Sequence, residues 1–268
     1  AALERVFAAR RYDAVMHFAS FIEVGESVRL PAKYYRNNVS NTLNLLECMQ
    51  AAGVEQFIFS STAAIFGTPQ RVPIDETHPT NPINPYGRSK LMVEQMLADL
   101  ARAHGLRSVC LRYFNAAGAD PDGQLGERHN PETHLIPLVL QAASGRRPFM
   151  SVFGTDYDTP DGTCIRDYVH VADLCEAHWL ALQSLAQGEG SQAYNLGNGD
   201  GFSVFEVIDT VRKVTGREFT VKHETRRAGD PSRLVADSSA ARQKLGWVPK
   251  YPSMQTIVEH AWAFEQRR

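Results

Sequence analysis

The sequence has no long apolar run, few cysteines and no excess of charge of either sign. No apolar stretch approaches the roughly 18 residues of a membrane-spanning helix, so we expect no membrane partner. The 28 basic and 30 acidic residues are intermixed and give a net charge of −2, which disfavours nucleic acid and favours a small-molecule ligand. The cysteines form no C-x-x-C pair, so we expect no disulfide framework and a reducing, cytoplasmic location.

Apolar runs alternate with helical patterns in the first half of the 268-residue chain. The runs cover residues 14–19, 56–62 and 108–114, and the helical stretches cover 1–11, about 27–52 and about 86–104. Continuous apolar strands alternating with helices are typical of a parallel sheet covered on both faces. We therefore expect an α/β fold with a doubly wound, Rossmann-like sheet over residues 1–117.

The second half, residues 118–268, has the pattern of a smaller α/β lobe. Polar loops at 118–133 and 154–163 separate shorter elements, including helices near 134–144 and 171–185. Ligands of doubly wound folds lie outside the carboxyl ends of the strands, so we expect the chemistry there and on the facing lobe.

The G-x-G-x-x-G turn that cradles phosphates in dinucleotide-binding folds is absent. The nearest imitation is Gly197-Asn-Gly-Asp-Gly201, which precedes Ser203 and Glu206 at the spacing of a capping box. We interpret these glycines as a tight turn into a helix. No spacing of His, Cys and carboxylate residues predicts a metal site.

The strongest catalytic signal is the pair Tyr86-x-x-x-Lys90. Residues i and i+4 share one face of a helix, and a neighbouring ammonium lowers the pKa of a phenol, which is otherwise near 10. Thr62 ends the second apolar run, where its hydroxyl faces the expected crevice. Thr62, Tyr86 and Lys90 together make an alcohol-oxidising triad, although a solvated helix turn and a backbone-bonded hydroxyl are the alternatives.

An ordered set of motifs resembles the extended short-chain dehydrogenase/reductase family and, within it, the UDP-glucose 4-epimerase group. The matching segments span the whole chain: 17–19, 24–27, 34–39, 57–62, 85–90, 111–115, 161–171, 194–197 and 226–230. The resemblance implies a bound NAD, a Rossmann domain over residues 1–117 and a mainly UDP-sugar-binding lobe over 118–268. It also implies a homodimer formed through the two long helices, in a cytoplasmic enzyme of galactose metabolism.

The implied reaction inverts C4 of a UDP-hexose through transient oxidation to a 4-keto sugar. By this resemblance Tyr86 removes the proton of the 4-hydroxyl with help from Thr62, and Lys90 orients the nicotinamide ribose. Further cofactor-binding positions are Phe18, Ala19, Ser20, Asn37 and Phe114. Further substrate-binding positions are Asn115, His134, Leu135, Phe153, Arg166, Arg227, Asp230 and Leu234, with the two arginines on the diphosphate. His170 is interpreted as structural.

Several residues depart from the family pattern. Ser20 replaces the usual Gly or Ala, Ile22 a Lys found in some members, and His134 a frequent Asn. Leu234 stands where bulk limits the substituent at C2 of the sugar, and its intermediate size leaves UDP-N-acetylhexosamine or UDP-pentose 4-epimerase open.

Two further alternatives have different chemistry. A 4,6-dehydratase needs an acid/base carboxylate pair after the Ser/Thr, whereas Ala63 and Ala64 stand here. A non-catalytic nucleotide-binding fragment needs no base, so the retained triad disfavours it. The resemblance places roughly 60 residues, including the glycine turn, ahead of Ala1, at about 30 residues per βαβ unit. We therefore expect this chain by itself to hold no NAD and to be inactive.

Overall fold

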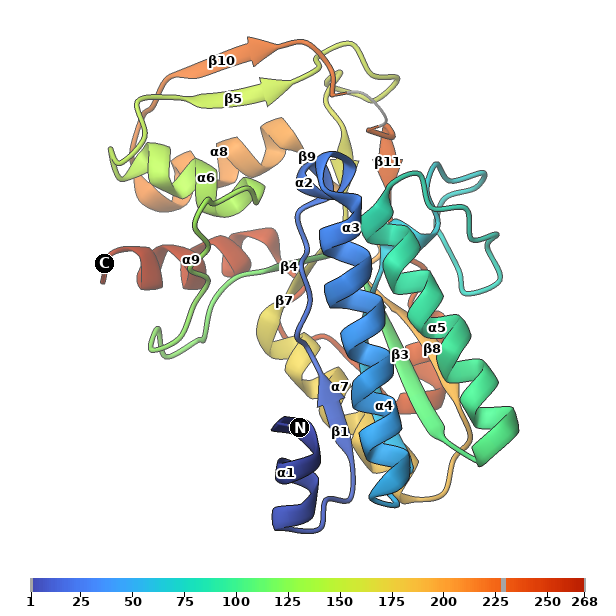
Figure 1. The fold of residues 1–268 in the computed structure, drawn as a ribbon. Coiled ribbons are helices and arrows are strands. Elements are labelled where there is room, and N and C mark those ends of the chain that lie inside the picture. The colour runs from blue at the N-terminus through green and yellow to red at the C-terminus, as the bar shows by residue number, and fades with distance from the viewer. Residues whose placement is uncertain (1, 228–229, 268) are drawn as a thin grey trace.

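A parallel four-stranded sheet forms the centre of the first lobe. The computed structural model describes residues 2–227 and 230–267. Its main sheet has the order β1-β2-β3-β8, and every neighbouring pair is parallel (Figure 1). The strands are β1 (Val15–His17), β2 (Gln56–Thr62), β3 (Arg107–Tyr113) and β8 (Gln192–Leu196). The predicted Rossmann-like α/β fold is confirmed, and a strand from the second half of the chain completes this sheet.

Alternate side chains of β2 supply two separate cores. Phe57 and Phe59 are fully buried against α4 (Asn41–Ala51) and α5 (Pro85–His104), which lie side by side on one face (Figure 1). Ile58 points to the opposite face, where it packs with α7 (Val171–Ala186). Because both faces are covered, β2 reads as a continuous apolar run.

The long helical stretch expected over residues 27–52 is interrupted. It consists of α2 (Val24–Arg29), α3 (Pro31–Tyr34), the π-helical turn η1 (Tyr35–Ser40) and α4. The break lies at Leu30, with φ −128° and ψ 57°. Pro31 follows it, and a proline disfavours helical backbone at the preceding residue and donates no hydrogen bond. The single-helix prediction was therefore wrong at this point.

The second lobe has a core of its own, built by α6 (Leu135–Ala143), α8 (Val204–Thr215) and α9 (Met254–Glu265). Two parallel strands, β5 (Met150–Phe153) and β10 (Val221–Glu224), cover it (Figure 1). The remaining elements are α1 (Ala2–Ala9), η2 (Ala63–Ile65), β4 (Asn115–Ala117), β6 (Ile165–Arg166), β7 (Tyr168–His170), β9 (Phe202–Ser203), β11 (Arg233–Leu234) and η3 (Ala241–Leu245). Within the described ranges, no helix combines the length and apolarity needed to cross a membrane.

The buried carboxylate of Asp167 joins three segments that are distant in sequence. It accepts hydrogen bonds from the backbone N–H groups of Asn198 (2.8 Å), Gly199 (3.0 Å) and Ala236 (3.1 Å). A Cβ added to Gly197 would lie 2.3 Å from this carboxylate. The glycine segment 197–201 therefore already directs two of its N–H groups at a protein side chain. Its interpretation as a turn is confirmed, and the capping box of Ser203 and Glu206 follows it.

We expect Asp167→Ala to be strongly destabilising, because it removes the buried acceptor of three N–H donors, of which that of Ala236 is buried and those of Asn198 and Gly199 are partly buried. Each such donor costs about 1–3 kcal/mol. The free energy of unfolding, measured by urea denaturation, should fall by at least ~3 kcal/mol. Asp158→Ala, at an exposed position, is the matched control and should change it by less than ~0.5 kcal/mol. Equal effects of the two substitutions would contradict this role of Asp167.

Candidate active site

Thr62 and Tyr86 meet where β2 ends and α5 begins. Thr62 is the last residue of β2, and Tyr86 lies in the first turn of α5. Asn84 caps this helix by accepting a hydrogen bond from the Gly87 N–H at 2.9 Å, and Pro85 occupies the first helical position. The hydroxyl of Thr62 lies close enough to the Tyr86 phenol to lower its pKa. The structure thus brings together two of the three residues predicted to be catalytic.

Gly87 permits this close approach. A Cβ built on Gly87 would lie 2.5 Å from the carbonyl oxygen of Ala64, in the turn that follows Thr62. Thr62 itself holds that turn by accepting a hydrogen bond from the Ala64 N–H at 3.1 Å. Backbone therefore packs on backbone at this contact, and any larger residue at position 87 would separate α5 from the end of β2.

Lys90 is buried one helical turn after Tyr86. Its Nζ donates a hydrogen bond to the Ser60 carbonyl at 2.8 Å and lies 4.8 Å from the centre of the Phe59 ring. The residue is only 4% exposed, and burial lowers the pKa of its amine to about 7. Burial, helped by the charge of Lys90, also lowers the pKa of His17 to about 4. The third predicted catalytic residue is thus a desolvated amine beside β2.

Burial raises the pKa of Tyr86 to about 12, although the Thr62 hydroxyl opposes the shift. The lowered phenol pKa expected from the Tyr-x-x-x-Lys spacing is therefore wrong for the chain by itself. Desolvation penalises the phenolate more than the neighbouring groups stabilise it. The Lys90 amine is also directed at the Ser60 carbonyl and carries less charge at neutral pH than an exposed lysine.

Asn38 is a structural residue of the site that the sequence interpretation did not identify. Its side chain accepts from the Phe21 N–H (2.9 Å) and donates to the Phe21 carbonyl (3.0 Å) and the Ser89 hydroxyl (3.1 Å). Ser89 in turn donates to the Tyr86 carbonyl at 2.7 Å. This chain of bonds fixes the segment after β1 against the first turn of α5. The only sequence signal was a polar residue at a buried helical position.

The predicted cofactor positions line the carboxyl ends of β1 and β3. Phe18, Ala19 and Ser20 follow β1, and Phe18 is 58% exposed with its ring 4.8 Å from that of His178. Asn37 donates to the Asn38 side chain at 3.0 Å. Phe114 follows β3 and packs against a buried cluster around Ala63 and Ile65. These positions lie at the strand ends, as doubly wound folds require of a ligand site.

Four predicted substrate residues form a second group, which we call the arginine group: Phe153, Arg166, Arg227 and Asp230. Arg166 makes an ion pair with Asp230, and the guanidinium of Arg227 lies 4.1 Å from the centre of the Phe153 ring. Leu234 pairs with Arg166 in the register of β11 and β6, and it packs with Phe114 and Ala63 in one apolar cluster. Leu234 thus connects the arginine group to the end of β2.

The other predicted substrate positions have different partners. Asn115 begins β4 and donates to the Asp167 carbonyl at 2.7 Å. His134 and Leu135 lie at the N-terminus of α6, where the His134 ring contacts Glu127 and Glu132. Their place in a ligand site stays a prediction. His170 is structural as expected, since it is fully buried and accepts from the Ala172 N–H at 3.0 Å.

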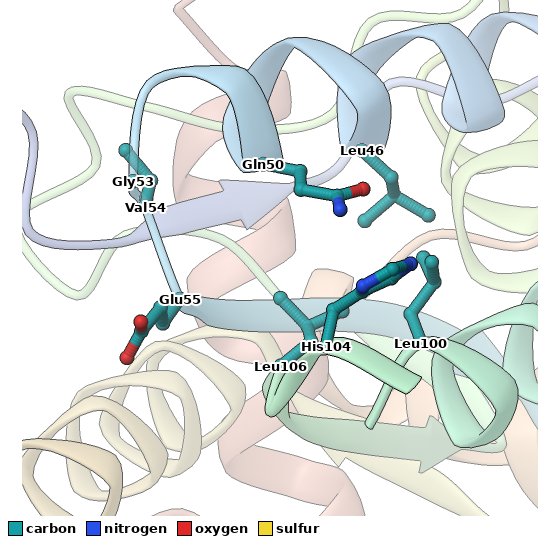
Figure 2. A pocket seen from close by; sticks show the side chains of 8 residues that line it. All are labelled: Leu46, Gln50, Gly53, Val54, Glu55, Leu100, His104 and Leu106. Atoms are coloured by element: carbon teal, nitrogen blue, oxygen red, sulfur yellow. The ribbon is translucent and has the colours of Figure 1, made fainter. Parts of the chain in front are cut away.

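A separate hollow lies between the C-terminal ends of α4 and α5. Leu46 and Gln50 approach it from α4, and Leu100 and His104 from α5 (Figure 2). Leu100 is 14 residues after Tyr86 along one helix, which corresponds to about 21 Å at 1.5 Å per residue. This hollow is therefore distinct from the Thr62–Tyr86–Lys90 group.

Comparison with known proteins decides the family. Residues 1–197 match the model of the NAD dependent epimerase/dehydratase family. The chain belongs to this family. It is 53% identical over 260 residues to the UDP-glucose 4-epimerase of Halalkalibacterium halodurans, with 97% of this chain and 78% of that protein covered.

Two solved structures agree with this family assignment. A UDP-glucose 4-epimerase from Brucella ovis in complex with NAD superposes with a TM-score of 0.95 at 51% identity, covering 97% of this chain and 80% of that one. The enzyme from Bifidobacterium longum, in complex with NAD+ and UDP, gives 0.94 at 41% identity, covering 99% and 79%. The doubly wound sheet described above is the fold of these epimerases.

The contact at Gly87 predicts an unusual cost for a conservative change in this epimerase/dehydratase-family protein. Gly87→Ala should lower the free energy of unfolding by about 1–3 kcal/mol, because the added methyl group clashes with the Ala64 carbonyl. Gly25→Ala is the matched helical control, since its Cβ would meet only the end of the Arg29 side chain at 3.8 Å. Urea denaturation measures both, and a Gly87→Ala protein as stable as wild type would refute the clash.

The lowered pKa of Lys90 predicts a pH dependence of stability. Between the folded pKa of about 7 and the ordinary lysine pKa near 10.4, the unfolded chain binds a proton that the folded chain does not. Burial of Lys90 therefore lowers the free energy of unfolding by its full amount below pH 7, and this loss becomes smaller as the pH rises towards 10. The difference in unfolding free energy, wild type minus Lys90→Met, should increase by at least ~1 kcal/mol from pH 7 to 9.5. A difference that does not change with pH would contradict the assignment.

Proposed function

We propose that this protein is an NAD-dependent epimerase that inverts C4 of a UDP-hexose, interconverting UDP-glucose and UDP-galactose in galactose metabolism. The observation that carries the proposal is the packing of the first turn of α5 on the end of β2, which places Tyr86 beside Thr62, one helical turn before the buried amine of Lys90. Such a set binds a sugar hydroxyl and holds or moves its proton, which a purely binding module does not need. Relatives named UDP-glucose 4-epimerase at 53% identity support the choice of reaction.

The residues present fit the nicotinamide half of NAD. Phe18, with its exposed ring, and Ser20 follow β1. Asn37 donates to Asn38, whose side chain bonds Phe21 and Ser89 and so ties this segment to the first turns of α5. The Lys90 amine is already desolvated and can donate to a ribose hydroxyl. When bound, NAD supplies a hydride acceptor that also returns the hydride, so the reaction has no net redox change.

Tyr86 and Thr62 handle the proton of the sugar 4-hydroxyl. We assign proton removal to the Tyr86 phenol oxygen and hydrogen bonding of the same hydroxyl to Thr62. A pKa of about 12 keeps the phenol protonated in the chain by itself, so a positive charge beside it is required to make it a base at neutral pH. Lys90 supplies part of that charge when it is protonated.

The arginine group suits the UDP part of the substrate. Arg166 and Arg227 offer guanidinium groups for the diphosphate, and the carboxylate of Asp230 offers acceptors for ribose hydroxyls. Asn115, His134, Leu135 and Phe153 complete the proposed substrate positions. The ion pair of Arg166 with Asp230 would be exchanged for contacts to the nucleotide.

The proposed catalytic and UDP-binding residues would also serve a UDP-N-acetylhexosamine or a UDP-pentose as substrate. Leu234 is held between Arg166 and the cluster around Ala63, so its bulk limits the sugar site. Dehydration is disfavoured because η2, directly after Thr62, begins with Ala63 and Ala64 rather than with a carboxylate pair. Incubation with UDP-N-acetylgalactosamine and UDP-arabinose beside UDP-galactose distinguishes the substrates. The absence of bound NAD, expected from the sequence, stays a prediction.

We further propose a role for each of the two lobes, a homodimer and a cellular location. Residues 1–117 form most of the NAD-binding domain, with β8 completing its sheet, and residues 118–268 form mainly the UDP-sugar lobe. A homodimer through α4 and α5 is supported by the exposed side chains of Leu43 and Met92 on these helices. A cytoplasmic location is supported by four cysteines that are all free.

The decisive experiment removes one oxygen atom. In any preparation that binds added NAD and converts UDP-galactose to UDP-glucose, Tyr86→Phe should reduce this conversion by at least about a hundredfold, because general base catalysis contributes ~10²–10⁴-fold. Separation of the product sugars measures turnover, and isothermal titration with UDP measures binding, which should stay within about threefold of wild type.

Tyr12→Phe is the matched control, since its hydroxyl accepts from the exposed Arg10 and the residue lies before β1. It should leave turnover unchanged. Undiminished turnover of the Tyr86→Phe protein would contradict the proposed mechanism. Loss of UDP binding would show that Tyr86 contributes to substrate binding rather than to proton removal.

A further inference from the structure

Four potential metal ligands converge in the segment that leads into α6: Glu127, His129, Glu132 and His134. We call them the Glu/His cluster. One ligand atom from each residue lies within 4.8 Å of the others. The Nδ1 atom of His134 is 2.5 Å from a Glu127 oxygen and 3.2 Å from a Glu132 oxygen. The Nδ1 atom of His129 is 2.7 Å and 4.0 Å from the same two oxygens. Each carboxylate thus faces both imidazoles.

We propose that the Glu/His cluster binds one divalent transition-metal ion, for which Zn²⁺ is the best match. Two imidazoles and two carboxylates are a ligand set that Zn²⁺ accepts in tetrahedral geometry. Zn–N and Zn–O bonds of about 2.0–2.2 Å require ligand atoms roughly 3.4 Å apart. The site therefore forms when the longest edge, at most 4.8 Å, shortens by up to about 1.4 Å and the contacts of 2.5 Å and 2.7 Å lengthen by less than about 1 Å. Imidazole ligands disfavour Mg²⁺ and Ca²⁺, which prefer oxygen.

The charge and exposure of the cluster suit a cation. Two carboxylates bring two negative charges, which attract a divalent cation. Without a metal, the hydrogen bond with Glu127 and the charges of Glu127 and Glu132 raise the pKa of His134. A protonated His134 then neutralises part of the negative charge. The side chains of Glu132 and Glu127 are 5% and 23% exposed, whereas those of His129 and His134 are 44% and 40% exposed. The ion can therefore enter from the imidazole side.

Part of the cluster is held in place before any metal binds. One oxygen of Glu132 accepts hydrogen bonds from the Thr133 N–H at 2.8 Å and the His134 N–H at 2.9 Å. His134 is the residue directly before α6, so its position is fixed by the start of that helix. The intervening Arg128 stacks on Phe264 at 5.2 Å from the ring centre. A bound metal would tie the preceding loop to the N-terminus of α6.

The sequence contains this site as Glu-x-His-x-x-Glu-x-His, a spacing that we did not expect to hold a metal. It lies within a polar loop rather than on one helix face, so periodicity alone does not align the four side chains. The cluster shares no residue with the Thr62–Tyr86–Lys90 group, but its His134 is also one of the proposed substrate positions. Its occupancy can be measured without any turnover.

The test is a zinc titration of the full chain. After treatment with EDTA and desalting, isothermal titration with ZnCl₂ in competition with a chelating dye should give one site per chain. His129→Gln and Glu132→Gln should each weaken binding at least tenfold, because each removes one of four ligands. His104→Gln and Glu47→Gln, at positions on α5 and α4, are the matched controls and should bind like wild type.

Two outcomes overturn the proposal. One is the lack of any stoichiometric zinc site in the wild-type chain. The other is wild-type affinity in both His129→Gln and Glu132→Gln, with circular dichroism confirming that they are folded. As a second readout, the visible d–d absorption of bound Co²⁺ should indicate tetrahedral coordination, and it should disappear in the His129→Gln protein.

Discussion

The contact of the α5 N-terminus with the end of β2 is the constraint on which the candidate site depends. Gly87 lies against the Ala64 carbonyl with no room for a Cβ, and this contact brings the Tyr86 phenol to the Thr62 hydroxyl. One helical turn later, the same helix buries Lys90 against Ser60. A shift of α5 by the width of a methyl group would thus disturb both residues at once. The geometry of the candidate site is set by backbone packing, which side-chain rotation cannot repair.

A second constraint couples the two lobes. Asp167 lies between β6 and β7 and holds the turn after β8 together with the strand end at Ala236. Its own backbone carbonyl accepts from Asn115, which follows β3. The arginine group begins at the neighbouring Arg166. The position of the proposed diphosphate ligands relative to the sheet is therefore determined by one buried carboxylate and its backbone donors.

The sequence predicted the parts of the fold that repeat a simple pattern. The strands β2 and β3 and the helix α5 lie within one residue of their predicted bounds, because buried strands and a capped helix have strong local signals. The helical stretch before α4 was mispredicted, since apolar periodicity continues across Leu30 although Pro31 breaks the backbone. Contacts between distant segments, such as Asn38 with Ser89, have no periodic signal at all. Neither has the Glu/His cluster, whose four residues lie in one irregular loop segment. Motif spacing placed Tyr86 and Lys90 on one helix but gave no information on their desolvation.

That desolvation determines the protonation states of Tyr86 and Lys90 before any ligand binds. Burial raises the pKa of Tyr86 and lowers that of Lys90, so in the chain by itself both groups favour their neutral forms. A phenolate beside an ammonium is costly to create in such surroundings unless further positive charge lies nearby. The base therefore gains strength only when a ligand brings that charge. An isolated sugar nucleotide would find Tyr86 protonated, able to donate a hydrogen bond but not to remove a proton. In the proposed mechanism, burial of Thr62, Tyr86 and Lys90 thus makes proton removal conditional on a complete ligand set.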